Sequence, residues 1–144
     1  MSLDAVYMLR DAICGAFTHR VGRWQANFGV DGKETNRHAL LICFRIKKKH
    51  VQMVIHAPAN YVGVYIRKEK GKWDCICYHD SCWRSEIDRF LFEHREDMHF
   101  ALTPSYAGDE LGTTAMRVTD AIFVVALPKE QLEEFSQIRK KRYG

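Results

Sequence analysis

Four residues of the types that bind zinc fall close together near the middle of the chain. Cys75, Cys77 and His79 would project to the same side if this segment is a strand, and Cys82 could turn back toward them. Thiolate and imidazole ligands suit the tetrahedral geometry of zinc. However, the spacing departs from the usual paired C-x2-C form, and neighbouring residues on one face of a strand are about 7 Å apart. We therefore expect no cofactor, with zinc as the alternative to an ordinary set of core and helix-starting cysteines.

A second pattern combines basic and aromatic residues over two neighbouring stretches. The predicted nucleic-acid-binding residues are Arg45, Lys47, Lys48, Lys49, Tyr65, Arg67, Lys68, Lys70, Lys72 and Trp73. Lysine and arginine can neutralise a phosphate backbone, while aromatic rings can stack on bases. A further basic run over 139–142 could extend this surface. The alternative is structural, because lysines at the edge of a sheet also prevent aggregation between strands.

No set of residues typical of an enzyme stands out. The chain lacks an H-E-x-x-H or G-x-S-x-G motif, a phosphate-binding loop and a dinucleotide-binding fingerprint. The order of expected helices and strands agrees only in outline with the core of restriction endonucleases, which use acidic residues and a lysine to hold a metal. The candidates for that role are Glu69, Lys70, Asp74, Glu86 and Asp88. They do not form the motif, and outline alone does not establish function. We therefore do not predict an enzyme, and a metal-dependent nuclease is the distant alternative.

Length and composition are those of an ordinary globular chain. Its 144 residues are 47% hydrophobic and 28% charged, which fits one domain, residues 1–144, with a sizeable core. The net charge of +4 permits binding to a polyanion without requiring it. The longest apolar run, 121–127, is too short to span a bilayer, and no signal-peptide pattern is present. Five cysteines, an odd number, fit reduced thiols, so we expect a cytoplasmic or other intracellular reducing compartment and no membrane association.

The first part of the chain predicts one helix and one strand. Ser2 can cap a helix over about 3–19. The residues that repeat at the spacing of one helix face are Val6, Leu9, Ile13 and Phe17. Alternating apolar residues then predict a strand over 24–30, and a polar loop follows over 31–37.

The stretch from His38 to His79 is predicted to be a meander of four antiparallel strands. Apolar residues alternate with others over 40–47, 51–56, 61–68 and 73–79. Turns are expected at Lys48-Lys49, at 57–60 and at 69–72. Connections this short require neighbouring strands to be antiparallel, because parallel pairs need long crossovers.

The remainder predicts two helices with strand between them. The middle helix is capped by Asp80 or Ser81. Its apolar face consists of Trp83, Ile87, Phe90 and Leu91. We then expect a short strand over 98–102, a long loop over 103–114 and one last strand over 115–127. Pro128 begins a C-terminal helix whose acidic residues come early and basic residues late, as the helix dipole favours.

These elements predict a single α+β domain, with a mainly antiparallel sheet of five to six strands covered by an N-terminal, a middle and a C-terminal helix. The predicted core residues are Leu9, Ile13, Leu40, Ile42, Phe44, Val62, Val64, Phe90, Ile122 and Val124. The first functional hypothesis is a small non-enzymatic module, either nucleic-acid-binding or regulatory, that uses the basic hairpins to contact DNA or RNA. The second is a protein-interaction module, a homo-oligomer or an inhibitor of a partner protein, that uses an exposed sheet face or the loop over 103–114.

Overall fold

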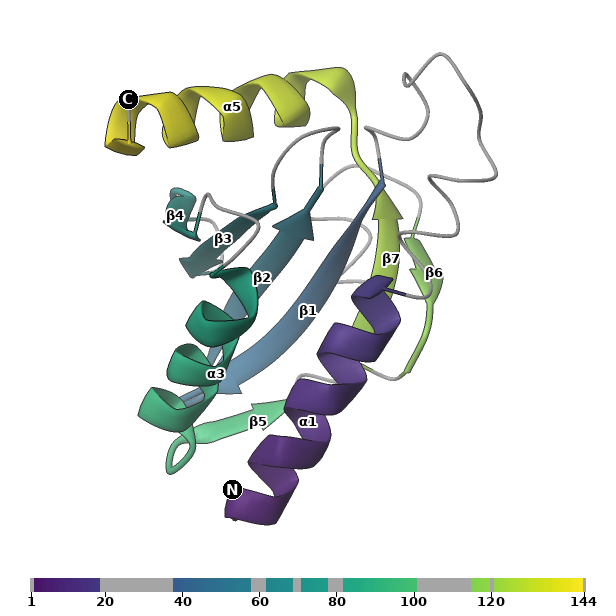
Figure 1. The fold of residues 1–144 in the computed structure, drawn as a ribbon, viewed down its shortest axis with the longest axis vertical. Helices are drawn as coiled ribbons and strands as arrows, with labels where there is room; N and C mark the ends of the chain where they lie inside the picture. Colours follow the sequence, from purple (N-terminus) through teal and green to yellow (C-terminus); the bar gives the residue numbers. More distant parts are fainter. Residues whose placement is uncertain are drawn as a thin grey trace.

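The computed structural model describes residues 2–18, 38–57, 62–68, 71–77, 82–100, 115–119 and 121–143 (Figure 1). Its elements are α1 (Leu3–Ala16), β1 (His38–Ile46), β2 (Lys49–His56), β3 (Gly63–Lys68), β4 (Asp74–Cys77), α3 (Trp83–His94), β5 (Met98–Phe100), β6 (Ala115–Arg117), β7 (Ile122–Ala126) and α5 (Lys129–Tyr143). One antiparallel sheet and three helices in the described ranges confirm the predicted α+β fold. The strand predicted over 24–30 and the loops predicted over 31–37 and 103–114 lie outside the described residues. None of the described helices combines the length and the apolar character that crossing a membrane requires.

The four strands of the predicted meander are neighbours in the sheet. The strand order is β4-β3-β2-β1-β7-β6, and β5 pairs with β1. Each of these pairs is antiparallel, so the meander is confirmed. β1 therefore has β2 along one edge and both β7 and β5 along the other (Figure 1).

Residues of β1 point alternately to the two faces of the sheet, and both faces are buried. Leu40 and Phe44 belong to a cluster that includes Ile13 of α1 and other residues of α1 and α3. Leu41, between them, belongs to a second cluster that includes Phe135 of α5. Figure 1 shows α1 and α3 on the near side of the sheet, with α5 across its upper end.

The predicted core is confirmed almost completely. Every residue of that set is buried except Val62, which is partly buried against the first cluster. Ser2 caps α1 as predicted, because its Oγ accepts a hydrogen bond of 3.2 Å from the N–H of Ala5. The residues proposed as the cap of the middle helix lie outside the described ranges, and Cys82 occupies the N-cap position of α3 without a side-chain capping bond.

The region predicted as one strand over 115–127 is instead a hairpin of β6 and β7. The chain reverses at Thr119, whose Oγ1 accepts hydrogen bonds from the N–H groups of Ala121 and Ile122. The carbonyl of Ile122 in turn accepts from the N–H groups of Val118 and Thr119. A hydroxyl that competes for backbone hydrogen bonds favours a turn, and this outweighs the apolar character of the segment.

The turn between β1 and β2 consists of Lys47 and Lys48, one residue earlier than predicted. Ile46 pairs with Lys49, and the φ angles of Lys47 and Lys48 are 52° and 66°. Positive φ at both central residues is typical of the type I′ turn, which matches the twist of a hairpin and prefers Asn-Gly. For a residue with a Cβ atom this backbone region is unfavourable by about 1–2 kcal/mol. The turn therefore carries backbone strain at two lysines.

Replacing the turn residues through Lys47→Asn and Lys48→Gly is expected to raise the free energy of unfolding by about 1 kcal/mol, because both new residues tolerate positive φ. Urea denaturation measures this change. Lys49→Gln is the control, since it removes a charge outside the turn and should change stability by less than about 0.5 kcal/mol. A double variant no more stable than the parent chain would contradict the left-handed turn.

Candidate functional site

The alternation of β3 places the predicted basic residues on different faces of the sheet. Lys68 and Ile66 point toward the α3 side, where both line a pocket. Tyr65 belongs to the cluster on the α5 side, and Arg67 has the same parity and lies over Trp73 of that cluster. The single predicted interface is therefore divided between two surfaces.

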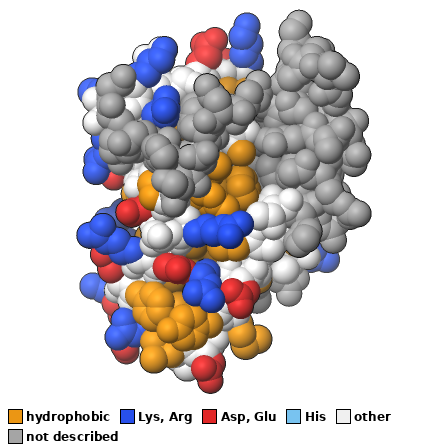
Figure 2. Space-filling view, in the orientation of Figure 1, with side chains coloured by type: hydrophobic (Ala, Val, Ile, Leu, Met, Phe, Trp, Pro, Cys, Tyr) orange, Lys and Arg blue, Asp and Glu red, His pale blue; other side chains and the backbone are white. Residues whose placement is uncertain are grey.

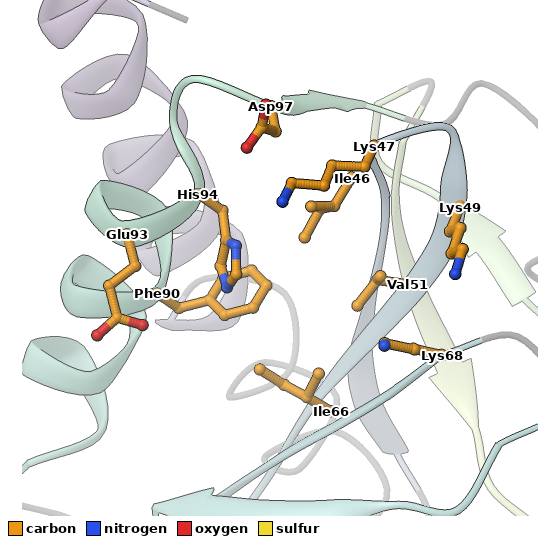
Figure 3. A pocket seen from close by; sticks show the side chains of 10 residues that line it. All are labelled: Ile46, Lys47, Lys49, Val51, Ile66, Lys68, Phe90, Glu93, His94 and Asp97. Carbon is orange, nitrogen blue, oxygen red and sulfur yellow. The ribbon is translucent and has the colours of Figure 1, made fainter.

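Three of the predicted lysines line one pocket between α3 and the sheet (Figure 3). The volume of this pocket is about 510 Å³. Its lining residues are Ile46, Lys47, Lys49, Val51, Ile66, Lys68, Phe90, Glu93, His94 and Asp97. The ends of β1, β2 and β3 form one wall, and α3 with the segment that follows it forms the other. We call this cavity the lysine pocket.

The core and the backbone fix the helical wall of the lysine pocket. The ring of Phe90 lies 5.5 Å from the ring of Phe44 in the core and 4.8 Å from the ring of His94, measured between centroids. The N–H of Lys47 donates a 3.1 Å hydrogen bond to the carbonyl of Asp97. This bond joins the strained turn to the segment that follows α3.

The cations of the lysine pocket have no anionic partner among the described carboxylates. Lys47, Lys49 and Lys68 are exposed, and the ion pairs of the described ranges include none of them. Figure 3 shows the ammonium groups of Lys47 and Lys68 directed toward the helical wall. Glu93 pairs instead with Arg89, at 3.3 Å, and its carboxylate points away from the lysines (Figure 3). The lining holds three lysines against two carboxylates, Glu93 and Asp97, so one positive charge is in excess, and this excess favours an anionic ligand.

Two aromatic residues of the predicted interface are buried, which contradicts the stacking role proposed for them. Tyr65 is fully buried and Trp73 nearly so. The ring of Phe135 on α5 stacks on Tyr65, with 4.3 Å between centroids, and contacts Trp73 edge-on at 5.1 Å. Phe135 therefore covers a ring face of Tyr65 that a base would need, and burial leaves little of Trp73 accessible.

Arg67 is also engaged within the protein. Its Nε donates a 2.7 Å hydrogen bond to Oε1 of Gln52, and its guanidinium lies 4.5 Å from the ring centroid of Trp73. A cation–π contact and a hydrogen bond of this kind would have to be given up before Arg67 could bind a phosphate.

The remaining basic residues are placed as follows. Arg45 is exposed on β1, where it pairs with His50 of β2 and His99 of β5. Lys48 is exposed at the turn, and Lys72 is exposed beside α5. Lys70 lies outside the described residues.

The four potential zinc ligands are not on one side of β4. A bulge lies opposite Val64 and Tyr65, which pair with Cys77 and Cys75, so Ile76 is the extra residue. Cys75 consequently belongs to the cluster on the α5 side and Cys77 to the cluster on the α3 side. The same-face arrangement expected for a regular strand is wrong. His79 lies outside the described residues, and within them no group of three or more suitable side chains could hold a metal.

Burial affects the thiols of two strand cysteines. It raises the pKa of the Cys75 thiol to about 11 and that of Cys43 to about 12. The Sγ of Cys75 donates to the carbonyl of Cys77, at 3.2 Å.

The bulge brings Cys77 close to Cys82, with 3.1 Å between their Sγ atoms. Diamide is expected to oxidise this pair to a disulfide, with loss of two hydrogens, because only a small movement separates the sulfurs from bonding distance. Thiol titration and peptide mass spectrometry measure the loss of two of the five thiols. Cys82→Ser should abolish it, whereas the matched control Cys14→Ser should keep it. Linkage between any other two cysteines would contradict this geometry.

Sequence reasoning missed the residues that complete the lysine pocket. Phe90 was correctly expected in the core, but its place beside the pocket was not foreseen, and His94 carried no recognisable motif. Their role depends on which turn of α3 faces the hairpin, which the spacing of apolar residues does not specify.

Fold and site together define this chain as an α+β sheet protein with a lysine-lined pocket. No protein-family model matches it, and neither the curated proteins nor the solved structures give a significant match.

Proposed function

We propose that this chain is a non-enzymatic module that binds nucleic acid through the lysines at the β1–β2 hairpin. The observation that carries the proposal is the lysine pocket, in which three lysines stand on the sheet side and form no ion pair with a described carboxylate. Lys48 adds a fourth cation at the adjoining turn. Lysines grouped in this way release condensed counterions when they contact phosphates, which drives association.

Fluorescence anisotropy with labelled single- and double-stranded DNA and RNA tests the proposal. The affinity is expected to fall steeply between about 50 and about 200 mM salt, and the slope of the logarithmic plot gives the number of phosphates neutralised. Absence of binding at the lower salt concentration, or an affinity that does not depend on salt, would overturn the proposal.

A protein-interaction module is the second candidate, favoured by exposed apolar residues on α1. Leu3, Tyr7 and Met8 are 52%, 43% and 72% exposed. The ring of Tyr7 lies 5.7 Å from that of Phe92 on α3. Figure 2 shows hydrophobic side chains gathered in the lower part of the molecular surface in view. Adjoining exposed apolar residues often mark protein contacts.

Met8→Glu separates this candidate from the first. If α1 mediates self-association, the mass measured by light scattering should rise with concentration in the parent chain and stay monomeric in the variant, because a charge opposes burial of this patch. Ser85→Glu adds the same charge at an exposed position of α3 and serves as the control. A monomeric parent chain at every concentration would remove self-association.

A further inference from the structure

We infer that the lysine pocket receives one unpaired nucleotide of a bound single strand. The inference rests on the proposed function and specifies the form of nucleic acid that the site recognises. It follows from the lining of the pocket and from the position of its charges.

The floor of the lysine pocket suits the flat face of a nucleobase. Ile46 and Ile66 come from two strands and are partly buried, so they present apolar surface to the cavity, while the nearly buried Val51 and Phe90 lie behind them. Bases stack on apolar and aromatic side chains with little dependence on sequence. The volume of about 510 Å³ lies within the range of pockets for small ligands. A base in a duplex is stacked and paired, so it would have to be extruded before it could enter.

Polar groups at the mouth match the two ends of a nucleotide. Lys47, Lys49 and Lys68 stand on the sheet side, where their ammonium groups can contact phosphate (Figure 3). His94 and Asp97 stand on the helical side, where they can exchange hydrogen bonds with the edge of a base.

The charge also continues beyond the pocket, because Lys48 is exposed at the adjoining turn. A chain of phosphates can contact Lys48 while one of its nucleotides fills the cavity. A single anionic amphiphile free in solution would present one head group and leave this cation unused. The arrangement therefore favours a polynucleotide over an amphiphile.

Filling the pocket while keeping every lysine tests the inference. Ile66→Trp places a larger side chain in the cavity from a partly buried position, and Ile66→Leu is the matched control. Anisotropy is measured with one labelled single strand and its duplex over a series of salt concentrations. The parent chain and Ile66→Leu should bind the single strand about tenfold more tightly than the duplex, the size expected for one stacked base. Ile66→Trp should lose this preference and keep the same salt slope.

The outcomes separate this inference from the proposed function. Equal affinity for both forms in the parent chain, or an unchanged preference in Ile66→Trp, overturns the unpaired-nucleotide site while salt-dependent binding still supports the module. Failure to bind either form overturns both, as does binding only to phosphatidylserine vesicles. Photocrosslinking of the parent chain to a strand that contains 5-iodouracil needs no variant. It should label the peptide that carries Phe90 and His94, and labelling confined to other peptides overturns the inference.

Discussion

Phe135→Ala is expected to lower the free energy of unfolding by about 3–5 kcal/mol, the largest effect of any single substitution considered for this chain. Phe135 is the fully buried side chain through which α5 covers its face of the sheet. Its ring contacts Tyr65, Trp73 and His56, with 6.3 Å to the centroid of the last. Truncation removes these contacts and leaves a cavity that a rigid sheet cannot close.

Urea denaturation followed by far-UV circular dichroism measures the effect. Gln137→Ala, at an exposed position of the same helix, is the control and should stay within about 0.5 kcal/mol of the parent chain. If Phe135→Ala cost no more than this control, α5 would not be packed on the sheet as described.

Removing three charges from the lysine pocket is expected to weaken nucleic-acid binding by more than about a hundredfold at about 0.1 M salt. The triple variant combines Lys47→Gln, Lys49→Gln and Lys68→Gln. Each phosphate contact contributes about 0.7 to the logarithmic salt slope for a single strand and about 0.9 for duplex DNA, so the slope should decrease by about two to three. Fold stability should change little, because all three side chains are exposed and form no described ion pair.

A second triple variant makes this result specific. Lys129→Gln, Lys140→Gln and Lys141→Gln remove the same charge from exposed positions of α5. Two of these belong to the basic run over 139–142 that the sequence offered as an extension of the surface, but none of the three lines the pocket. This control should keep most of the affinity. Equal losses in the two triple variants would mean that binding follows net charge, and the lysine pocket would then not be the site.

The sheet was predictable where the sequence alternates regularly. Leu40, Ile42 and Phe44 share a face by parity alone, and short connections then require antiparallel neighbours. Parity does not reveal whether the opposite face is covered. Tyr65 and Trp73 were therefore expected in solvent, although α5 buries them.

Local irregularities in the strands were the second reason why part of the structure could not be predicted from the sequence. One extra residue at Ile76 places Cys77 on the opposite face of the sheet from Cys75, and no pattern of residue types marks this bulge. The cysteine cluster was misplaced for this reason. The pocket depended on a third unknown, the register of α3 against the hairpin, so its lysines were found by charge and its apolar floor was not.

The position of β1 also has a consequence for how the chain folds during synthesis. β2 joins β1 through a turn of two residues, whereas β7, its partner on the other edge, comes far later in the sequence. Short loops close at lower entropic cost than long ones, and ribosomes release the N-terminal part first. We expect the β1–β2 hairpin to form early, before β7 and α5 have been synthesised. During that interval the face that carries Leu41 and Val54 lacks its helix, and the nascent chain is most exposed to aggregation.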